Sequence, residues 1–312
     1  MRTVVILGLL LTACGGPELF EHERTEFAFG SYFRIKLLAK SEARAESSLT
    51  RAFSRVHRLD TLWSAFLPGS DVARVSQLRR AAVSSETRVL VEAALRLGDV
   101  TGGALDVTVA PLMEAWGFPD GRYRVPDSAE LARMLPHVGY SWVTVSGDSV
   151  SLPPEVGIDL GAVAVGHAVD LVVDSLIADG IEQGLVDAGG DIRVFGDREW
   201  RIGLQDPRGD GVVRVFGLRN RAISTSGDYQ KFFERNGERY CHIVDPVTGR
   251  PACHFASVTV LAPSALTADA YSTALFVMGV EGMGLFEAED SLAAVVLVPI
   301  GDSLQMLEAG SP

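Results

Sequence analysis

Apolar residues recur at two different spacings along the chain, and the spacing separates predicted helices from predicted strands. Between Ser41 and Phe66 they fall every three or four positions, for example at Leu49, Val56 and Trp63. This spacing places them on one face of a long amphipathic helix, for which Ser41 is a candidate N-cap. The same criteria predict further helices at about Ser85 to Leu97, Asp127 to Leu135, His167 to Ala178 and Ala268 to Met278.

Segments rich in β-branched and aromatic residues predict strands between these helices. The predicted strands are Glu26 to Leu38 with a break at Gly30-Ser31, a hairpin between Tyr140 and Leu152, Leu185 to Val194, Trp200 to Leu204, Val212 to Leu218, Arg239 to Val244, Ser257 to Ala262, and two near Leu292 to Val298 and Leu304 to Leu307. Strand clusters between helices without strict alternation indicate an α+β fold. Since no repeat or linker interrupts the chain, we expect one compact unit.

Composition and charge narrow the classes of function. The chain has 312 residues, 47% of them hydrophobic, which is enough for a large core. Its formal net charge is -12 and its pI about 5.0, so a basic surface for nucleic acid is not expected. An anionic ligand would therefore need local donors or a metal ion.

The N-terminus has the pattern of a bacterial lipoprotein signal. Arg2 precedes an apolar run from Val4 to Leu11, and small residues stand directly before Cys14. The run is too short to cross a bilayer. We expect a signal peptide over residues 1–13, a tether over 14–24 with a lipidated Cys14, and a folded domain over 25–312. The chain would then be anchored to the extracytoplasmic, periplasmic face of the bacterial inner membrane; the alternative is a buried strand that ends in Cys14.

Two further cysteines leave three alternatives open. Cys241 and Cys253 are each followed by a histidine, His242 and His254. In an oxidising compartment they can form a disulfide, or they can remain two unlinked thiols. Zinc is the third alternative, although adjacent ligands are poor zinc geometry.

Candidate chemistry is concentrated between Ala222 and Gly279. Asp269 and Thr273 lie four residues apart on one helix face and could offer a carboxylate and a hydroxyl oxygen to Mg²⁺. The alternative for Asp269 is a carboxylate stabilised by the helix dipole. His242 stands at a strand end before a polar turn, where it is either structural or a base for a hydroxyl nucleophile.

Two small-residue segments are candidate phosphate loops. Ser224 to Gly227 could hold phosphate oxygens or form a simple turn. Asp159 to Gly166 is a glycine-containing loop that enters a helix, where backbone N–H groups favour anions. Its spacing matches neither a Walker nor a Rossmann motif, and the chain lacks a Gly-x-Ser-x-Gly elbow.

Taken in order, these segments resemble the ApbE family of FAD:protein FMN transferases. The motifs that carry the resemblance are Phe29-Gly30-Ser31, Ser64-Ala65-Phe66 with Ser70-Asp71, Gly103 to Thr108 with Pro111-Leu112 and Trp116-Gly117-Phe118, Asp159 to Ala162, Ala188 to Asp191, Ser226 to Tyr229, His242 to Gly249, and Ala268 to Thr273. The resemblance covers nearly all of the chain after the tether. It implies a single domain related to the T-fold, with mixed or antiparallel sheets and flanking helices.

The resemblance also implies a reaction and a set of site residues. Such enzymes bind FAD with Mg²⁺ at its pyrophosphate, transfer FMN to a Thr or Ser hydroxyl of a membrane-associated protein, and release AMP. The implied Mg²⁺ ligands are the Ala162 carbonyl, Asp269 and Thr273, and His242 with Asp269 would be catalytic. The implied FAD-binding residues are Phe29, Phe66, Ala104, Leu105, Asp106, Asp159, Val165 and Ile243.

This chain departs from the family pattern at three of these positions. Val165 stands where a Lys or Glu is usual, Phe66 where a Tyr is common, and Phe29 where a Met is common. The loss of a charged contact at Val165 would weaken FAD binding or change specificity. Two alternatives therefore accompany the transferase: an Mg²⁺-dependent FAD pyrophosphatase that yields FMN and AMP, and a non-catalytic flavin-binding lipoprotein.

Overall fold

The computed structural model describes residues 19–301 and 303–311, so the predicted signal peptide and Cys14 lie outside the described residues. The α-helices are α1 (Glu42–Trp63), α2 (Asp71–Leu78), α3 (Ser85–Val100), α4 (Ala110–Trp116), α5 (Ser128–Met134), α6 (Gly161–Ala178), α7 (Ala265–Met278) and α8 (Gly284–Glu287). The strands are β1 (Phe20–Ala28), β2 (Ser31–Ala39), β3 (Arg80–Ala82), β4 (Thr144–Ser146), β5 (Ser149–Ser151), β6 (Gln183–Ala188), β7 (Asp191–Phe195), β8 (Trp200–Gln205), β9 (Val212–Leu218), β10 (Ala222–Gly227), β11 (Phe232–Arg235), β12 (Glu238–Cys241), β13 (Ser257–Ala262), β14 (Ala293–Ile300) and β15 (Ser303–Gly310).

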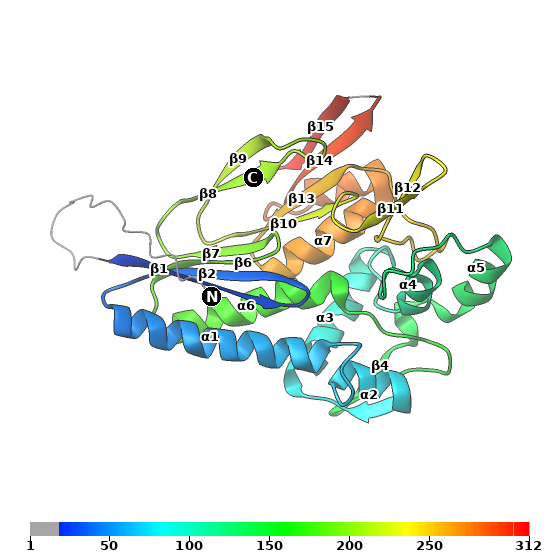
Figure 1. Ribbon diagram of the computed structural model, residues 1–312, viewed down its shortest axis with the longest axis horizontal. Coiled ribbons are helices and arrows are strands. Elements are labelled where there is room, and N and C mark those ends of the chain that lie inside the picture. Colours follow the sequence, from blue (N-terminus) through cyan, green and yellow to red (C-terminus); the bar gives the residue numbers. More distant parts are fainter. Residues whose placement is uncertain (1–18, 302, 312) are drawn as a thin grey trace.

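An eight-stranded sheet forms the centre of the molecule (Figure 1). Its strand order is β1-β2-β6-β7-β10-β13-β14-β15, and every neighbouring pair is antiparallel. Sequence neighbours β1–β2, β6–β7 and β14–β15 are hairpins, so most of the sheet is built from local pairs. The predicted α+β class with antiparallel sheets is confirmed.

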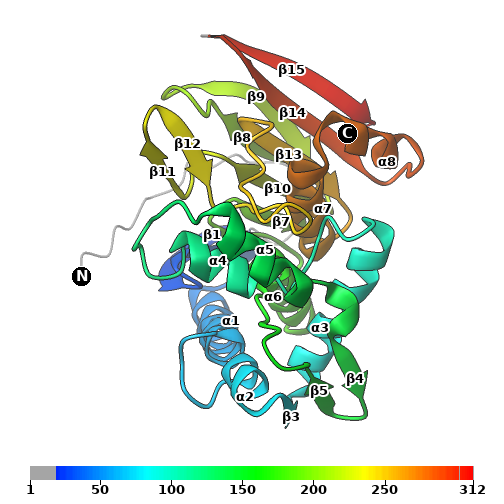
Figure 2. The same cartoon turned by 90° about the vertical axis from the view of Figure 1, so that its right-hand side faces the viewer.

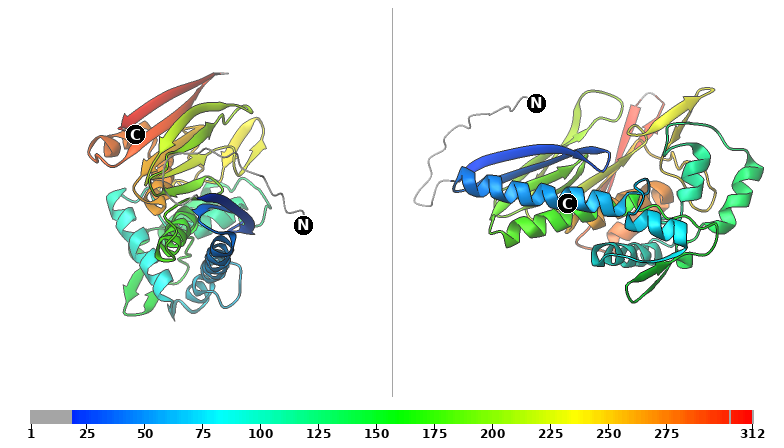
Figure 3. Two further views of the ribbon diagram at one scale, coloured as in Figure 1. Left: turned by 90° about the vertical axis from the view of Figure 1, so that its left-hand side faces the viewer. Right: turned by 60° about the horizontal axis from the view of Figure 1, so that its bottom comes forward.

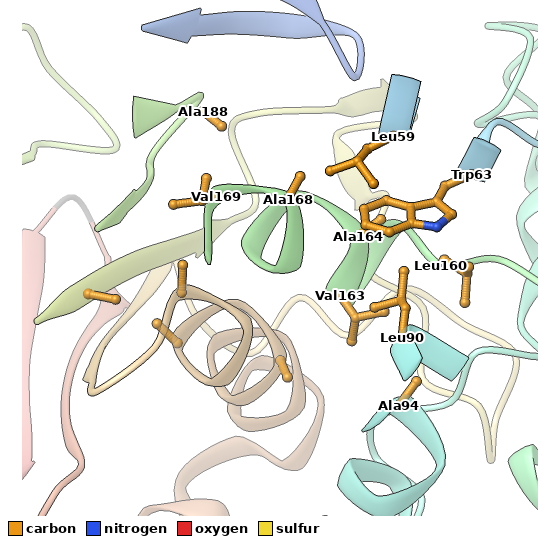
Figure 4. Close-up of a cluster of buried hydrophobic side chains, with 14 of the residues drawn as sticks. Leu59, Trp63, Leu90, Ala94, Leu160, Val163, Ala164, Ala168, Val169 and Ala188 are labelled. Atoms are coloured by element: carbon orange, nitrogen blue, oxygen red, sulfur yellow. The ribbon is translucent and has the colours of Figure 1, made fainter. Parts of the chain in front are cut away.

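Helices α1, α6 and α7 cover one face of this sheet, and α6 lies between the other two (Figures 1 and 3). Their buried side chains form the main hydrophobic core with β2, β6, β10 and β13. Figure 4 shows part of this core, where Trp63 of α1 lies over Ala164 and Leu160 at the start of α6. Helix α6 is long and apolar enough to cross a membrane, but it packs against α7, α1 and the sheet as a core helix.

The β8–β9 hairpin covers the opposite face of the sheet and closes a second, smaller core. Trp200, Leu204 and Phe216 of the hairpin are buried there against Val194 and Leu261 of the sheet. Burial of apolar area on both faces explains why β13 has no exposed position along its length.

A third group of elements lies beyond the C-terminal end of α1 (Figure 2). It contains α2 to α5, the small sheet β3-β5-β4 and the separate β11–β12 hairpin. Trp116 of α4 is fully buried and donates from Nε1 to the Gly249 carbonyl at 2.8 Å. This bond ties α4 to the loop that follows β12.

Several predicted elements have different bounds in the structure. Helix α6 begins at Gly161 rather than near His167, so the expected loop over 159–166 is mostly helix. Ser224 to Gly227 was expected as a loop and is part of strand β10. The predicted strand over 185–194 is a hairpin, because Gly189 and Gly190 adopt positive φ angles of 69° and 111° and reverse the chain.

The N-terminal part of the domain begins earlier than expected. Strand β1 starts at Phe20, so residues 20–24 belong to the sheet rather than to the tether. The sequence pattern also missed α2 and β3, which are too short to show a clear period.

Candidate active site

Helices α6 and α7 are in close contact at Gly166. A Cβ atom at this position would lie 2.5 Å from the Ala265 carbonyl oxygen and 2.8 Å from Cβ of Asp269. The Gly166 N–H donates to Oδ2 of Asp269 at 3.1 Å. In an α-helix the same N–H faces the carbonyl oxygen four residues earlier, which belongs to Ala162. The Ala162 carbonyl and the Asp269 carboxylate therefore both face the Gly166 N–H.

Asp269 carries a charge that the surrounding protein destabilises. Only 7% of the residue is exposed, and burial raises the pKa of its carboxyl well above the usual value, with a further contribution from Asp191. Burial also raises the pKa of Asp191 to about 7. A bound cation would compensate this negative charge, and the oxygen donors suit a hard ion such as Mg²⁺.

A chain of hydroxyl groups links Asp191 to Thr273. Ser224 donates to Oδ1 of Asp191, and Ser272 lies 3.4 Å from Ser224. Ser226 lies 2.8 Å from Ser272 and 3.3 Å from the Thr273 hydroxyl. Ser224 and Ser226 reach the same face because alternate residues of strand β10 point to one side. The serines predicted as a phosphate loop thus lie beneath α7 and support Thr273.

The Phe29-Gly30 turn joins β1 and β2 at the opposite side of α6. Phe29 adopts a φ of 53° and Gly30 a φ of 73°, the backbone of a tight two-residue hairpin turn. A positive φ is unusual for a bulky residue. The Phe29 ring packs against Trp63 at 6.1 Å between centroids, and Trp63 stacks on His167 at 5.7 Å. Phe29 is therefore connected through Trp63 to His167 of α6, two residues after Val165.

The segment from Ala104 to Asp106 lies beside Asp159. The Asp159 N–H donates to the Val107 carbonyl at 2.7 Å, and Oδ1 of Asp159 accepts from the Gly161 N–H at 2.7 Å, at the start of α6. Asp106 accepts from Thr108 and from the Tyr140 N–H at 2.8 Å. Leu105 is buried. Asp106 thus shapes its loop, and the loop borders the N-terminal end of α6.

Phe66 and Val165 differ in their surroundings. Phe66 follows α1 in a loop and is 73% exposed, so its ring is available to a ligand. Val165 is half-buried at the edge of the main core, on the second turn of α6. An apolar side chain is stable at that position without any charged partner.

His242 and Ile243 lie on the loop after β12, where Ile243 is buried. The His242 ring is half-buried, and its Nδ1 lies 3.2 Å from the Lys231 carbonyl oxygen. Burial lowers the pKa of His242 to about 4, and Lys231 lowers it further, so the imidazole is neutral at pH 7. An Nδ1–H that donates to the carbonyl leaves the Nε2 lone pair free to accept a proton.

The cysteine pairs do not form a zinc site in the described residues. Cys241 and Cys253 are unlinked thiols whose Sγ atoms lie 2.8 Å apart. Across residues 19–301 and 303–311, no group of three or more His, Cys, Asp or Glu side chains is arranged to hold a metal ion. The candidate Mg²⁺ site differs from such a group because it combines one carboxylate with a carbonyl and a hydroxyl oxygen.

The structure thus places Asp269 of α7 against Gly166 of α6, four residues after Ala162, and places Thr273 one turn further along α7. It connects Phe29 and the Ala104–Asp106 segment to the same end of α6. His242 lies on a separate loop, and its hydrogen bonds within the described chain go to Lys231. Sequence analysis missed the contribution of Asp191, although Ser224 and Ser226, spaced by two in a buried segment, were a signal for a polar strand face.

Comparisons with known proteins identify the family of the chain. Residues 29–296 match the model of the ApbE family. The chain is 36% identical to an FAD:protein FMN transferase of Vibrio cholerae over 97% of its length and 95% of the relative's. It is 34% identical to one of Haemophilus influenzae, covering 86% and 84%. Among solved structures, the ApbE protein of Thermotoga maritima superposes with a TM-score of 0.87 at 32% identity, covering 93% and 97% of the two chains.

The flavin transferase ApbE of Vibrio cholerae superposes with a TM-score of 0.84 at 33% identity, covering 94% and 98%. These matches extend over almost the whole described domain, including both helices of the candidate site. The chain belongs to the ApbE family.

Proposed function

We propose that this protein is an FAD:protein FMN transferase that uses Mg²⁺ and modifies a Thr or Ser hydroxyl. Transfer of FMN from FAD to a protein is the activity for which its relatives are named. The observation that carries the proposal is the contact of Asp269 on α7 with Gly166 on α6, four residues after Ala162, with Thr273 one turn further along α7. On this geometry, the Ala162 carbonyl, the Asp269 carboxylate and the Thr273 hydroxyl are proposed to share one cation.

The proposed metal ligands are the Ala162 carbonyl, the Asp269 carboxylate and the Thr273 hydroxyl. Their fit is supported by the buried charge of Asp269, which hydrogen-bonds to Gly166 and lies near a second carboxylate. Bound Mg²⁺ would supply positive charge to the pyrophosphate oxygens of FAD. The protein contributes the fixed positions of the oxygens, because α6 and α7 are core helices.

The flavin would lie between the elements that border the N-terminal end of α6. Phe29 and the exposed Phe66 offer aromatic faces, and the Ala104–Asp106 segment with Asp159 offers polar edges. Val165 and Ile243 would add apolar contacts. The proposal assigns Val165 a packing role, which removes the charged contact that is usual in the family.

His242 would act as the base for the acceptor hydroxyl. The hydroxyl oxygen forms a bond to the FMN phosphorus, the bond from that phosphorus to the bridging oxygen breaks, and AMP leaves. The hydroxyl proton passes to Nε2 of the neutral imidazole. The hydrogen bond from Nδ1–H to the Lys231 carbonyl would hold the imidazole in the tautomer that leaves Nε2 free. The reaction is thus a substitution at phosphorus that depends on position and charge.

We further propose that the protein works at a membrane. The signal pattern before Cys14 supports a lipid anchor on the extracytoplasmic side of the inner membrane, and the acceptor would be a membrane-associated protein. A labelled-palmitate incorporation assay on wild type and Cys14→Ser tests this anchor. Equal labelling of the two proteins would refute it.

The reaction is tested by incubating the protein with FAD, Mg²⁺ and a Thr-bearing acceptor. Flavin fluorescence that stays with the acceptor through denaturing electrophoresis, together with AMP, supports the transferase. AMP with free FMN alone would support a pyrophosphatase. Binding of FAD without release of AMP would support a non-catalytic flavin-binding protein and would refute both enzymatic functions.

The metal site is tested with Asp269→Ala, which should abolish Mg²⁺-dependent AMP release. Asp174→Ala is a suitable control, because Asp174 lies on α6 with 62% of its side chain exposed. Isothermal titration of Mg²⁺ provides a readout that does not depend on turnover. Unchanged Mg²⁺ binding by Asp269→Ala would exclude the assigned site.

A further inference from the structure

Cys241 and Cys253 form a close pair of thiols at the base of a loop. Their Sγ atoms lie 2.8 Å apart, and the Cys241 N–H donates to Sγ of Cys253 at 3.4 Å. Formation of a disulfide, with a bond of about 2.0 Å, would need a shift of less than about 1 Å between the two atoms. The pair is therefore arranged for intramolecular oxidation.

The loop between the two cysteines is a short hairpin that carries His242. The Ala252 N–H donates to the Ile243 carbonyl at 2.9 Å, and the Asp245 N–H donates to the Arg250 carbonyl at 2.8 Å. Cys241, at the end of β12, directly precedes the segment joined by these two hydrogen bonds, and Cys253 directly follows it. A bond between them would close the open end of the hairpin beside the imidazole.

The two thiols have different surroundings. Cys253 is exposed, and a hydrogen bond from the Cys241 side chain lowers the pKa of the Cys253 thiol. Cys241 is buried, and its pKa is raised, first by the hydrogen bond with Cys253 and then by burial. An oxidant can reach Cys253 directly and Cys241 only through Cys253. This order is typical of an attacking thiol and a resolving thiol.

We propose that Cys241 and Cys253 form a reversible disulfide that closes the His242 loop when the protein meets a disulfide oxidant. Sulfur of Cys253 attacks one sulfur of the oxidant, its S–S bond breaks, and one thiol leaves. Cys241 then attacks Cys253 in the mixed disulfide and releases the second thiol. The two cysteines lose two electrons and two protons, and the oxidant gains both as two thiols. Neither the metal site nor FMN transfer is required for this step.

The proposal is tested on the full chain, reduced with dithiothreitol and then treated with oxidised glutathione. Free thiols are blocked with N-ethylmaleimide under denaturing conditions. Because Arg250 is the one basic residue between the two cysteines and is followed by Pro251, where trypsin does not cut, trypsin leaves both cysteines on one peptide. A protease that cleaves before aspartate cuts at Asp245 and separates peptide 228–244 from peptide 245–268. Mass spectrometry should find these two peptides linked, and dithiothreitol should release them.

Two variants provide matched controls. Cys241→Ser should stop at a mixed disulfide of glutathione with Cys253, because the resolving thiol is missing. Cys253→Ser should leave Cys241 free for maleimide, because the buried thiol is not reached. In the wild type, closure should slow hydrogen exchange in residues 242–252 and raise Tm by on the order of 5 °C relative to the reduced protein.

Three results would overturn the proposal. The first is labelling of both thiols by maleimide after oxidation, and the second is a stable glutathione adduct on Cys253 of the wild type. The third is a linkage of either cysteine to Cys14 instead. Unchanged exchange in the hairpin, despite a linked pair of peptides, would show that the bond does not hold the His242 loop.

Discussion

The Thr273 hydroxyl has one hydrogen, and its direction decides what the oxygen can bind. Ser272 donates its hydrogen to the Asp269 carbonyl at 2.9 Å. At the 2.8 Å contact between Ser226 and Ser272, Ser226 must therefore be the donor. Since Ser226 has then used its hydrogen, Thr273 donates at their 3.3 Å contact. The lone pairs of Thr273 remain free for a cation.

We expect Ser226→Ala to weaken Mg²⁺ binding about tenfold, because Thr273 loses the acceptor that orients it. Isothermal titration measures the change. Thr225→Ala is the matched control, since Thr225 lies on the same strand but bonds to Thr259 at 2.9 Å. An equal loss in both variants would show that strand β10, rather than the direction of the Thr273 hydroxyl, is responsible.

Sequence analysis identified these residues only in part. Asp269 and Thr273 were predicted from their helical spacing, which is a local property. The run of Ser224, Thr225 and Ser226 was predicted as a loop because small polar residues are common in turns. They form a buried strand here because Asp191 and α7, which are distant in sequence, satisfy the two serine hydroxyls.

At the scale of elements, the crossing of α6 and α7 depends on Gly166. Asp170 of α6 reinforces the crossing, since it accepts from the N–H groups of Ala265 and Leu266 at 2.9 Å and so caps α7. Neither contact could be predicted, because both join residues about one hundred positions apart. The two helices themselves were predictable, since each is a long apolar segment and α7 is followed by Gly279.

We expect Gly166→Ala to destabilise the fold by about 3 kcal/mol, because the added Cβ meets backbone atoms of a packed helix. It should also abolish Mg²⁺ binding, since separation of the helices moves Asp269 away from Ala162. Denaturant unfolding and Mg²⁺ titration measure the two effects.

Gly284→Ala is the control for that substitution. No heavy atom lies within 4 Å of a Cβ at Gly284, and its φ of -60° suits any residue. The free energy of unfolding of Gly284→Ala should differ from that of the wild type by less than about 0.5 kcal/mol. A Gly166→Ala protein as stable as this control would contradict the close packing at the crossing.

For the whole molecule, two partly buried groups give the free energy of unfolding opposite dependences on pH. The pKa of Asp191 is raised to about 7, so its contribution to stability is complete below pH 4 and is lost as the pH rises through 7. The pKa of His242 is lowered to about 4, so its contribution is complete above pH 6.5 and is lost as the pH falls through 4.

We expect Asp191→Asn to raise the free energy of unfolding by roughly 1 to 2 kcal/mol at pH 8 and to have little effect at pH 4 in metal-free protein. His242→Gln should show the reverse: it should raise the free energy of unfolding at pH 4 and have little effect at pH 8. Urea unfolding at pH 4 and at pH 8 measures the free energy of unfolding of each variant. If the two variants followed the wild-type profile in parallel, other groups would control the pH dependence.

On the proposal that Cys14 carries a lipid anchor, the position of Phe20 limits how far the folded domain can lie from the bilayer. On the lipoprotein proposal, the six-residue step from Cys14 to Phe20 can span at most about 20 Å. Strand β1 then runs nine residues to the Phe29 turn, roughly 30 Å further. The flavin end of the domain can thus rise no more than about 50 Å from the lipid along this path. On this proposal, an acceptor would have to present its hydroxyl within that distance of the membrane surface.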